Sequence, residues 1–305
     1  MKDLKTNKIL VIFHKVDYDG LFSNAVVRKH YNGDDIVSFG YNYNDSLDDM
    51  PDFDDFDKIV IADISLPVGV MKDLRDNHYD KVQWVDHHIT AINDSVSNGY
   101  DDMRGLRSTS YSACKLCWMY YFGGADIPYA VDLVATNDIW DKESYDWDNE
   151  VQAYQYGLNA TYKMSAENIS DNFGEILEDA NVHETQKLGL KVKGYMDDLY
   201  KTWCGRFSFD VTVDGKWRGI CMISPMFTSK IFDSVSADYD CCVILEKNGK
   251  QEGVYNVSLY SDKNIPELSC GEYMKSHYNG GGHKGAAGGT MTLEQFTRVL
   301  NEHTL

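Results

Sequence analysis

Long apolar runs are missing from this chain of 305 residues. No uninterrupted apolar segment approaches the ~18 residues that mark a membrane-spanning helix. The first residues carry several charges, and no long apolar stretch precedes Phe13, so the start of the chain does not look like a signal peptide. The sequence therefore predicts a protein that stays in the cytoplasm and has no membrane partner.

Paired cysteine motifs are missing as well. The seven cysteines are odd in number, and the spacing from Cys114 to Cys117 is the one near-motif, with no second pair to accompany it. A disulfide framework and a cysteine-based zinc site are therefore both disfavoured. We expect buried, reduced thiols instead.

Basic residues are scarce. Lys and Arg number 29 against 48 Asp and Glu, which gives a formal net charge of −19. Such a charge opposes an extended grip on duplex nucleic acid, because that grip depends on contacts between basic side chains and phosphates. A short anionic substrate remains compatible if bound cations supply positive charge locally. The acidic run over residues 45–57 lacks the glycine and terminal glutamate of a calcium loop, so we interpret it as a solvated connection.

Three short apolar runs, typical of buried strands, end in carboxylates or imidazoles. They cover residues 8–13, 58–62 and 82–85, and an apolar stretch of helix or strand character over 130–135 precedes a further carboxylate. Open α/β sheets bind ligands at the carboxyl ends of their strands, so we expect these polar side chains to converge. They are His14, Asp17, Asp19, Asp63, Asp86, His87, His88 and Asp138.

This many carboxylates at one sheet edge carry a dense negative charge, which is tolerable only if cations neutralise it. Carboxylates and neutral imidazoles without thiolates suit Mn²⁺ or Mg²⁺ better than structural zinc. Asp86-His87-His88 alone could equally be a solvated turn. Its repetition at neighbouring strand ends favours a site for divalent metal ions.

These clusters, in this order, resemble the motifs of the DHH phosphoesterase superfamily. The first is His14, Asp17, Asp19 and Gly20; the second is Asp63; the third is Asp86-His87-His88; and the fourth is Asp138. Near the other end, Gly280-Gly281-Gly282-His283, within residues 280–288, resembles the glycine-rich signature of the DHH-associated C-terminal domain, DHHA1. The spacing of the first motif and the sequence over 257–261 are most similar to the nanoRNase and oligoribonuclease branch. Tyr260 departs from that pattern, because several relatives have Arg there.

The resemblance implies two divalent ions, Mn²⁺ in preference to Mg²⁺, that share one ligand. It assigns His14, Asp17 and Asp63 to one ion, and Asp19, Asp63, His87 and Asp138 to the other. A water held between the ions would attack phosphorus, so no protein nucleophile is needed. His88 would face the phosphoryl oxygens and Asp86 would orient an imidazole. Asp63, Asp86 and His88 are therefore the predicted catalytic residues.

Substrate contacts are predicted from both ends of the chain. The glycines at 280–282 can offer backbone N–H groups to a phosphate at close range, and His283 would add a charge-assisted donor. Arg107, between the third and fourth motifs, is a further phosphate-binding candidate, although an ordinary surface charge is the default reading of an arginine. His88 completes the predicted substrate-binding set.

Strands that alternate with helices predict an α/β domain with a parallel sheet and helices on both faces. The expected helices cover residues 21–30, 68–77 and 110–122. From about residue 145 the apolar pattern becomes a longer helical register, through 169–177 and 183–200, which predicts a helical linker. We therefore expect a DHH catalytic domain over residues 1–165 and a linker over 166–205.

The last part of the chain predicts a smaller α+β domain over residues 206–305. Its strands are expected over 207–213 and 217–223, joined by a hairpin turn at Asp214-Gly215, and over 241–245 and 253–260. The sheet should be mixed but mostly antiparallel.

The expected activity is two-metal hydrolysis of phosphodiester bonds in short oligonucleotides. The expected partners are short single-stranded oligonucleotides or small nucleotides, not long duplexes, and a homodimer is left open. A cyclic-dinucleotide phosphodiesterase and a phosphoadenosine phosphate phosphatase are alternative enzymes. A metal-dependent nucleotide-binding regulatory module without turnover is the alternative outside enzymes, and the complete set of predicted ligands favours catalysis.

Overall fold

The computed structural model describes residues 6–43, 45–124, 126–162, 173–225, 228–261, 263, 265, 267–282 and 284–305. The chain divides into two compact units, Met1–Lys193 and Gly194–Leu305. The division falls inside the long helix α9 (Asp179–Phe207), which contributes residues to both units. The predicted limits at residues 165 and 205 stay predictions.

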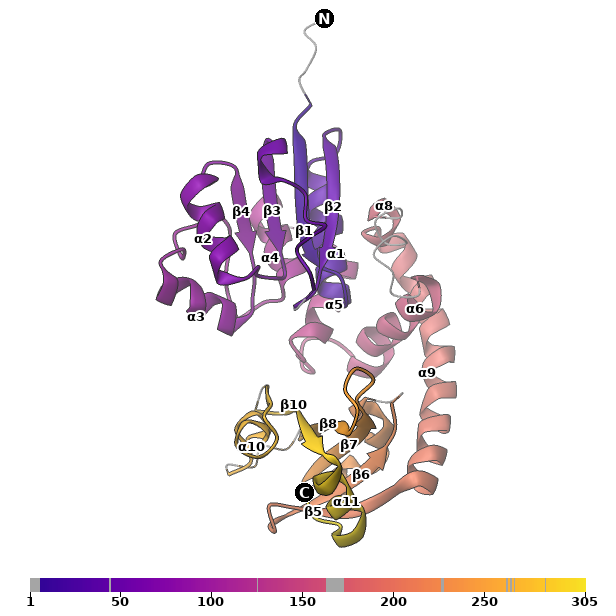
Figure 1. Cartoon of the computed structure of the whole chain (residues 1–305). Coiled ribbons are helices and arrows are strands. Elements are labelled where there is room, and N and C mark those ends of the chain that lie inside the picture. The colour runs from indigo at the N-terminus through magenta and orange to yellow at the C-terminus, as the bar shows by residue number, and fades with distance from the viewer. Residues whose placement is uncertain are drawn as a thin grey trace, which may run out of the picture. The chain divides into compact units, whose positions relative to one another are not determined.

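The first unit is built on a parallel sheet in the order β2-β1-β3-β4 (Figure 1). Its strands are β1 (Lys8–His14), β2 (Asp35–Tyr41), β3 (Lys58–Ala62) and β4 (Val82–Val85). The inner strands β1 and β3 are apolar and buried at nearly every position, as strands covered on both faces should be. Because all four strands run in one direction, their carboxyl ends meet at one edge.

Helices cover both faces of this sheet, as predicted. Side chains of α1 (Tyr18–His30), α4 (Ala113–Phe122), α5 (Tyr129–Asp138) and α6 (Ala153–Tyr162) share one apolar cluster with one face. On the other face, α2 (Val68–Asn77) contributes Met71 and Leu74, and α3 (Ile89–Asn98) contributes Ala91. Successive strand residues alternate between the two clusters, which is the two-residue period of a strand.

Several elements of the first unit lie where the sequence places them, and β2 (Asp35–Tyr41) and α3 (Ile89–Asn98) were not predicted. The predicted helix over 68–77 is α2. The apolar stretch over 130–135 is helical, within α5. The predicted helix over 169–177 lies partly outside the described residues, and its described part contains the short helix α8 (Phe173–Ile176). The acidic run over 45–57 connects β2 to β3, as expected, with a short helical turn η1 (Phe53–Asp55).

The second unit holds a mixed sheet in the order β5-β6-β7-β8-β10-β9. Within the described part of this sheet, β6 and β7 are the one parallel strand pair, so the sheet is mostly antiparallel, as predicted. The strands are β5 (Ser208–Val213), β6 (Trp217–Ile223), β7 (Cys241–Lys247), β8 (Val254–Tyr260), β9 (Gly281–Gly282) and β10 (Ala286–Thr292), and the helices are α10 (Cys270–His277) and α11 (Leu293–Glu302).

The predicted hairpin at Asp214-Gly215 is confirmed. Asp214 and Gly215 have φ of 52° and 65°, in the left-handed region, and the Lys216 N–H closes the turn by donating to the Val213 carbonyl at 3.1 Å. The register pairs Val213 with Trp217, so three residues connect the strands. The cysteine prediction is also confirmed, since all seven thiols are free and buried. Among the described residues, none of the helices has the length and hydrophobicity needed to cross a bilayer.

Candidate metal centre

The register of the parallel sheet brings three motif residues to one line. Phe13 pairs with Ala62, and Ala62 pairs with Val85. The residues that follow these three are His14, Asp63 and Asp86, which therefore leave the sheet side by side. Residues separated by more than 70 positions in the sequence thus share one edge, where parallel-sheet proteins place their ligands.

Asp63 lies at the centre of this edge. Its side chain is 1% exposed, and its φ of 61° is in the left-handed region, a strained conformation for a residue with a side chain. The Asp63 N–H donates to the Val85 carbonyl at 2.9 Å, which fixes the backbone there. Neither carboxylate oxygen accepts a hydrogen bond from the residues that the structure describes. Buried oxygens of this kind need a cation or a proton.

One group of ligand atoms surrounds the Oδ2 atom of Asp63. His14 Nδ1 lies 3.6 Å from that oxygen and 2.6 Å from Asp17 Oδ2. The other ring nitrogen of His14, Nε2, lies 3.2 Å from Asn42 Oδ1, which suits an N–H donor there and leaves Nδ1 facing the carboxylates. His14, Asp17 and Asp63 therefore form a cluster able to hold a metal ion, with the membership that the resemblance implies.

Asp17 and Gly20 shape the start of helix α1. Asp17 is the N-cap, and its Oδ1 accepts the Gly20 N–H at 2.9 Å while its Oδ2 faces His14. A Cβ on Gly20 would lie 2.0 Å from the His14 carbonyl oxygen, so only glycine allows the helix to begin this close to the strand end. The glycine of the first motif therefore serves the approach of α1 to β1.

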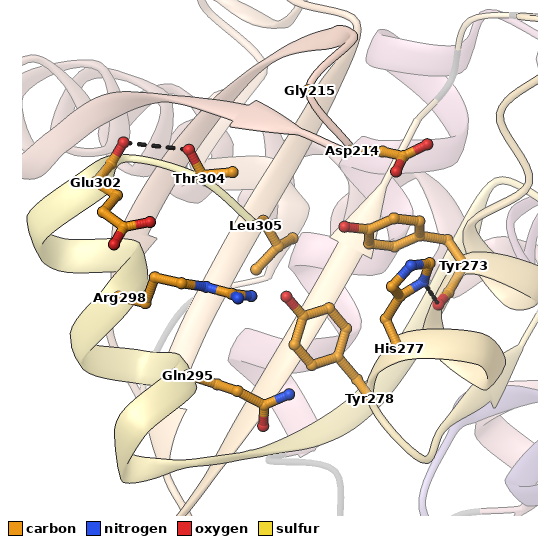
Figure 2. A pocket seen from close by; sticks show the side chains of 10 residues that line it. All are labelled: Asp214, Gly215, Tyr273, His277, Tyr278, Gln295, Arg298, Glu302, Thr304 and Leu305. Carbon is orange, nitrogen blue, oxygen red and sulfur yellow. Dashed lines mark hydrogen bonds between the residues drawn. The ribbon is translucent and has the colours of Figure 1, made fainter.

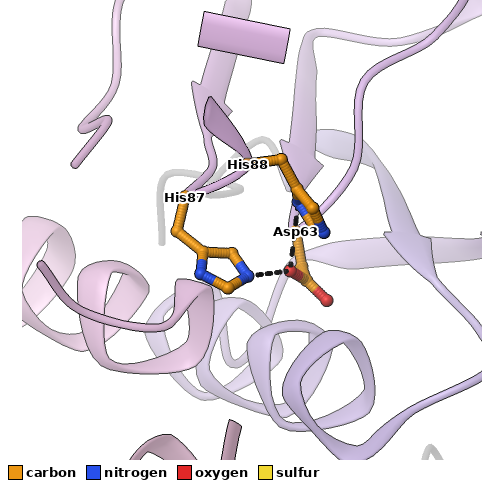
Figure 3. A group of neighbouring side chains, drawn as sticks. All are labelled: Asp63, His87 and His88. Carbon is orange, nitrogen blue, oxygen red and sulfur yellow. Dashed lines mark ion pairs between the residues drawn. The ribbon is translucent and has the colours of Figure 1, made fainter. Parts of the chain in front are cut away.

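A second group surrounds the Oδ1 atom of Asp63. His87 Nε2 lies 3.4 Å from Asp63 Oδ1, 3.6 Å from Asp19 Oδ2 and 3.5 Å from Asp138 Oδ2 (Figure 3 shows Asp63 between His87 and His88). The ligand atoms here form two overlapping groups, Asp19–His87–Asp138 and Asp63–His87–His88, with His88 Nδ1 3.9 Å from Asp63 Oδ1. The assignment of Asp19, Asp63, His87 and Asp138 to one ion stays a prediction. The two oxygens of Asp63 thus face different imidazoles, as a shared ligand would.

Asp19 is held by a helix that lies far away in the sequence. Its Oδ2 accepts the Ala113 N–H and its Oδ1 accepts the Cys114 N–H, both at 2.7 Å. These N–H groups belong to the first turn of α4, where the helix dipole favours an anion. The contacts fix the carboxylate but leave oxygen lone pairs for a further partner.

Asp138 ends helix α5. The side chain of Asn137, the residue before Asp138, accepts a hydrogen bond from the Gln152 amide at 2.8 Å. Trp140, just beyond the helix end, has a left-handed conformation with φ of 59°. The Oδ2 atom of Asp138 is buried and accepts no hydrogen bond from a described residue. It is the third unpaired carboxylate oxygen of the site.

Asp86 is fully buried and binds the turn that carries the two histidines. Its Oδ1 accepts the His87 N–H at 2.7 Å and the His88 N–H at 3.1 Å, and it lies 2.8 Å from His88 Nδ1. Its Oδ2 accepts the Trp84 indole N–H at 3.2 Å. The imidazole next to the Asp86 carboxylate is therefore that of His88.

The pKa shifts reflect a carboxylate cluster that lacks positive charge. Burial, together with the charge of Asp19, raises the pKa of Asp63 well above its usual range and that of Asp138 to about 8. Burial lowers the pKa of His14, but the carboxylates of Asp17 and Asp63 outweigh it and raise that pKa to about 10. Protons thus take the place that cations would occupy. The donor set, the unpaired buried oxygens and the crowded charge all fit divalent metal ions.

The fold of this chain is similar to that of several solved structures. A pGpG-specific phosphodiesterase from Vibrio cholerae shares 16% identity, with a TM-score of 0.57 over 98% of this chain and 97% of that one. The DHH domain of a member of the s1p family of ribosomal proteins gives a TM-score of 0.55 at 14% identity, over 96% of this chain and 84% of that one. This chain has the DHH fold.

A third structural neighbour is an exopolyphosphatase-related protein from Bacteroides fragilis. It shares 14% identity, with a TM-score of 0.51 over 97% of this chain and 91% of that one. No protein-family model and no curated protein sequence matches this chain. We call Met1–Lys193, which carries the four motifs, the DHH unit.

The Arg107 guanidinium of the DHH unit donates hydrogen bonds to backbone carbonyl groups. Its guanidinium donates to the carbonyls of Trp84 at 3.0 Å, Asp101 at 3.0 Å and Met103 at 2.7 Å, and it lies 5.0 Å from the centre of the Trp84 ring. These contacts explain the arginine as a clamp on the loop after α3. A role in phosphate binding stays a prediction.

The glycine-rich segment is part of a strand pair. Gly281 and Gly282 form β9, which pairs with β10, and Ala286 and Ala287 are the first residues of β10. The Gly280 N–H donates to the Met274 carbonyl at 3.1 Å, and a Cβ on Gly280 would lie 2.0 Å from the Gly288 carbonyl oxygen. Gly281 and Gly282 are exposed, and His283 lies outside the described residues. Phosphate binding by this segment stays a prediction.

Two side chains at the site were missed by the sequence analysis. Asn42, which contacts His14, and Tyr43 both follow the unpredicted strand β2. The Tyr43 ring lies 5.8 Å from the His14 ring and 6.2 Å from the His88 ring. The apolar and β-branched residues of 36–41 were the signal that could have revealed this strand end.

Two cavities lie in separate units. One, of about 370 Å³, lies in the DHH unit between α4, α5 and the segment that follows α5. The other, of about 300 Å³, lies between α10, α11 and the β5–β6 turn of the second unit, and Figure 2 shows its tyrosines and Arg298. None of the predicted site residues lines either cavity.

Proposed function

We propose that this protein is a metal-dependent phosphoesterase that hydrolyses phosphodiester bonds of short nucleotides, and that it uses two divalent ions, Mn²⁺ or Mg²⁺. The observation that carries the proposal is the position of Asp63. Its two buried oxygens have no hydrogen-bond partner among the described residues, and each faces a different ligand cluster. A shared carboxylate between two clusters is the arrangement that a two-metal site requires.

His14, Asp17 and Asp63 would hold one ion, and Asp19, Asp63, His87 and Asp138 the other. When bound, the ions would lower the pKa of a water and stabilise negative charge that develops on the phosphate. The protein itself holds the ligands rigidly: Asn42 orients His14, and the first turn of α4 orients Asp19. Such outer contacts fix ligand geometry and commonly affect metal affinity.

His88 is the side chain that we assign to the phosphoryl oxygens. Asp86 accepts from its Nδ1 atom, which fixes the ring and leaves Nε2 as the nitrogen available to a substrate. The side chain of His88 is 30% exposed, whereas that of Asp86 is fully buried. His88 would therefore contact the substrate, while Asp86 acts through it as a positioning residue.

Short nucleotides are favoured over long polymers for two reasons. The net charge of −19 opposes binding of an extended polyanion. In addition, the structural neighbour that aligns over 97% of its own length is a phosphodiesterase specific for pGpG, a dinucleotide. The similarity supports a short linear substrate without identifying the one that this protein uses.

Turnover measurements on a panel of substrates would test the proposal. The panel should contain di- to decanucleotides, cyclic dinucleotides and phosphoadenosine phosphate, each with Mn²⁺, with Mg²⁺ and with a chelator. We expect metal-dependent release of mononucleotides, fastest with the shortest linear substrates. A chain that binds the metals and the nucleotides but releases no product with any of them would be a binding module, and the enzymatic proposal would be wrong.

A further inference from the structure

We propose that the cavity between α4 and α5 of the DHH unit binds the nucleoside that flanks the scissile phosphate. The inference rests on the proposed function and adds a substrate-binding site to it. Its volume is about 370 Å³, at the lower end of the ~300–1,000 Å³ typical of small-molecule sites. That size suits one nucleoside better than two.

Two elements that line the cavity also hold or carry carboxylates of the second ligand cluster. Ser110 and Tyr111 line it directly before the turn of α4 whose N–H groups hold Asp19. Thr136 and Ile139 line it on either side of Asp138 in sequence, at the end of α5. The start of α4, which binds Asp19, and the end of α5, which carries Asp138, therefore both contribute residues to the cavity lining. A phosphate at the metals could carry its nucleoside into this cavity.

The cavity offers an apolar and aromatic surface. Tyr111 is 39% exposed and Ile139 is 37% exposed, so two large apolar side chains remain accessible beside a ligand cluster. The Lys115 ammonium lies 5.4 Å from the centre of the Tyr111 ring, which helps to hold that ring in place. A flat nucleobase can stack on such a ring whatever its hydrogen-bonding edge.

The charge of the cavity argues for a neutral group. Lys115 pairs with Asp132 at 2.6 Å, and Tyr145 donates to the other Asp132 oxygen at 3.0 Å. Asp141 accepts from Ser144 and from the Glu143 N–H. One ammonium against two carboxylates leaves the lining with a net negative charge, which repels phosphate. The base and the ribose belong here, and the phosphate belongs at the metals.

This cavity would therefore distinguish nucleotides from inorganic polyphosphates, which have no neutral aromatic part to place in it. The test compares the binding of guanosine and adenosine 5′-monophosphate with the binding of inorganic phosphate, in the presence of Mn²⁺ and without turnover. Tyr111→Ala removes the stacking surface, and Ser110→Trp fills the cavity from an exposed position.

Tyr79→Ala is the matched control. Tyr79 is 37% exposed, close to the 39% of Tyr111, but it lies before β4 and hence at the opposite edge of the sheet from the metal ligands. We expect Tyr111→Ala and Ser110→Trp to weaken nucleotide binding by roughly 5- to 100-fold, with phosphate binding changed less than about twofold. The control should bind both as the parent chain does.

Unchanged nucleotide affinity in both Tyr111→Ala and Ser110→Trp, or equal losses for nucleotide and phosphate, would overturn the proposed nucleoside site. These measurements are separate from those that test the activity. If the parent chain hydrolyses dinucleotides while both variants keep full nucleotide affinity, the proposed nucleoside site is wrong and the proposed activity stands. If the variants show the expected losses of nucleotide binding but the parent chain has no turnover, the proposed activity is wrong and the nucleoside site stands.

Discussion

Asp63 joins the two ligand clusters because its oxygens face different imidazoles, His14 on one side and His87 on the other. The strained backbone at this residue, with φ of 61°, directs the carboxylate between them. Asparagine tolerates that conformation better than alanine does, so Asp63→Asn tests the carboxylate without adding backbone strain.

Asp63→Asn should lower turnover by roughly a thousandfold or more and release bound metal, because it removes charge and a ligand from both clusters. It should also stabilise the metal-free chain by roughly 1–3 kcal/mol, since a buried and unpaired carboxylate is lost. Elemental analysis and chemical denaturation in a chelator measure the two effects. Retention of two tightly bound Mn²⁺ ions per chain would contradict the shared-ligand role.

A second prediction at this scale concerns protons. The raised pKa of Asp138, about 8, means that the folded metal-free chain holds a proton that the unfolded chain releases near its usual pKa of 3.8. Its contribution to stability is therefore present at low pH and is lost as the pH rises toward 8. His14, with a pKa of about 10, adds stability that is complete below its usual pKa of 6.5 and is lost as the pH rises through 10.

Metal binding near pH 7 should therefore release protons from these groups, and Mn²⁺ should raise the melting temperature more at pH 8 than at pH 5.5. Calorimetric titration in buffers of different ionisation enthalpy measures the released protons directly. A binding enthalpy that does not depend on the buffer would show that the groups are already deprotonated.

At the scale of the element, Asp19 connects two helices that are distant in the sequence. It belongs to α1, yet it accepts both of its hydrogen bonds from the first turn of α4, whose own N-cap residue Ser112 makes no side-chain capping bond in the described structure. Asp19 thus replaces the local cap.

Asp19→Ala should destabilise the chain by roughly 2–3 kcal/mol even without metal, because two buried N–H groups lose a charged acceptor. Urea denaturation in a chelator provides the measurement, and Ser112→Ala is the control that should cost less. Equal effects of the two substitutions would mean that Asp19 does not hold the helix.

The start of α1 depends on Gly20. Gly20→Ala would place a methyl group 2.0 Å from a backbone oxygen, so strand and helix must separate, at a cost of roughly 3 kcal/mol. Gly69 in α2 is the control, because a Cβ there meets nothing within 4 Å, and Gly69→Ala should stabilise the chain by about 0.4–1 kcal/mol. Thermal unfolding of both variants measures the two changes in stability. If Gly20→Ala leaves the stability unchanged, α1 does not approach the end of β1 as closely as the structure shows.

At the scale of the whole molecule, phosphate binding by His283 is a prediction from the sequence that a single substitution tests. His283→Ala should leave the metals bound while kcat/KM for a dinucleotide falls by roughly one to two decades, as expected for one charge-assisted contact. The loss should fade on bis-p-nitrophenyl phosphate, which has no second phosphate. Equal losses on both substrates, measured by steady-state kinetics, would assign His283 to the chemistry.

The sequence by itself determined the residues of the motifs and much of the fold. Apolar runs that end in Asp63 and in Asp86-His87-His88 predict β3 and β4, because burial on both faces demands continuous apolar strands. The hairpin at Asp214-Gly215 is equally local, since few residues adopt the left-handed turn. Local patterns predict what depends on neighbours along the chain.

The tertiary structure alone decided which groups meet. The register that aligns Phe13, Ala62 and Val85, the N–H groups of α4 that hold Asp19, and the Asn42 contact to His14 all join residues that lie far apart in the sequence. Arg107 likewise finds its carbonyl partners only once its loop folds back onto Trp84. Hydrogen-bond partners and strand register depend on the packing of whole elements, and the periodicity of apolar residues in the sequence predicts neither.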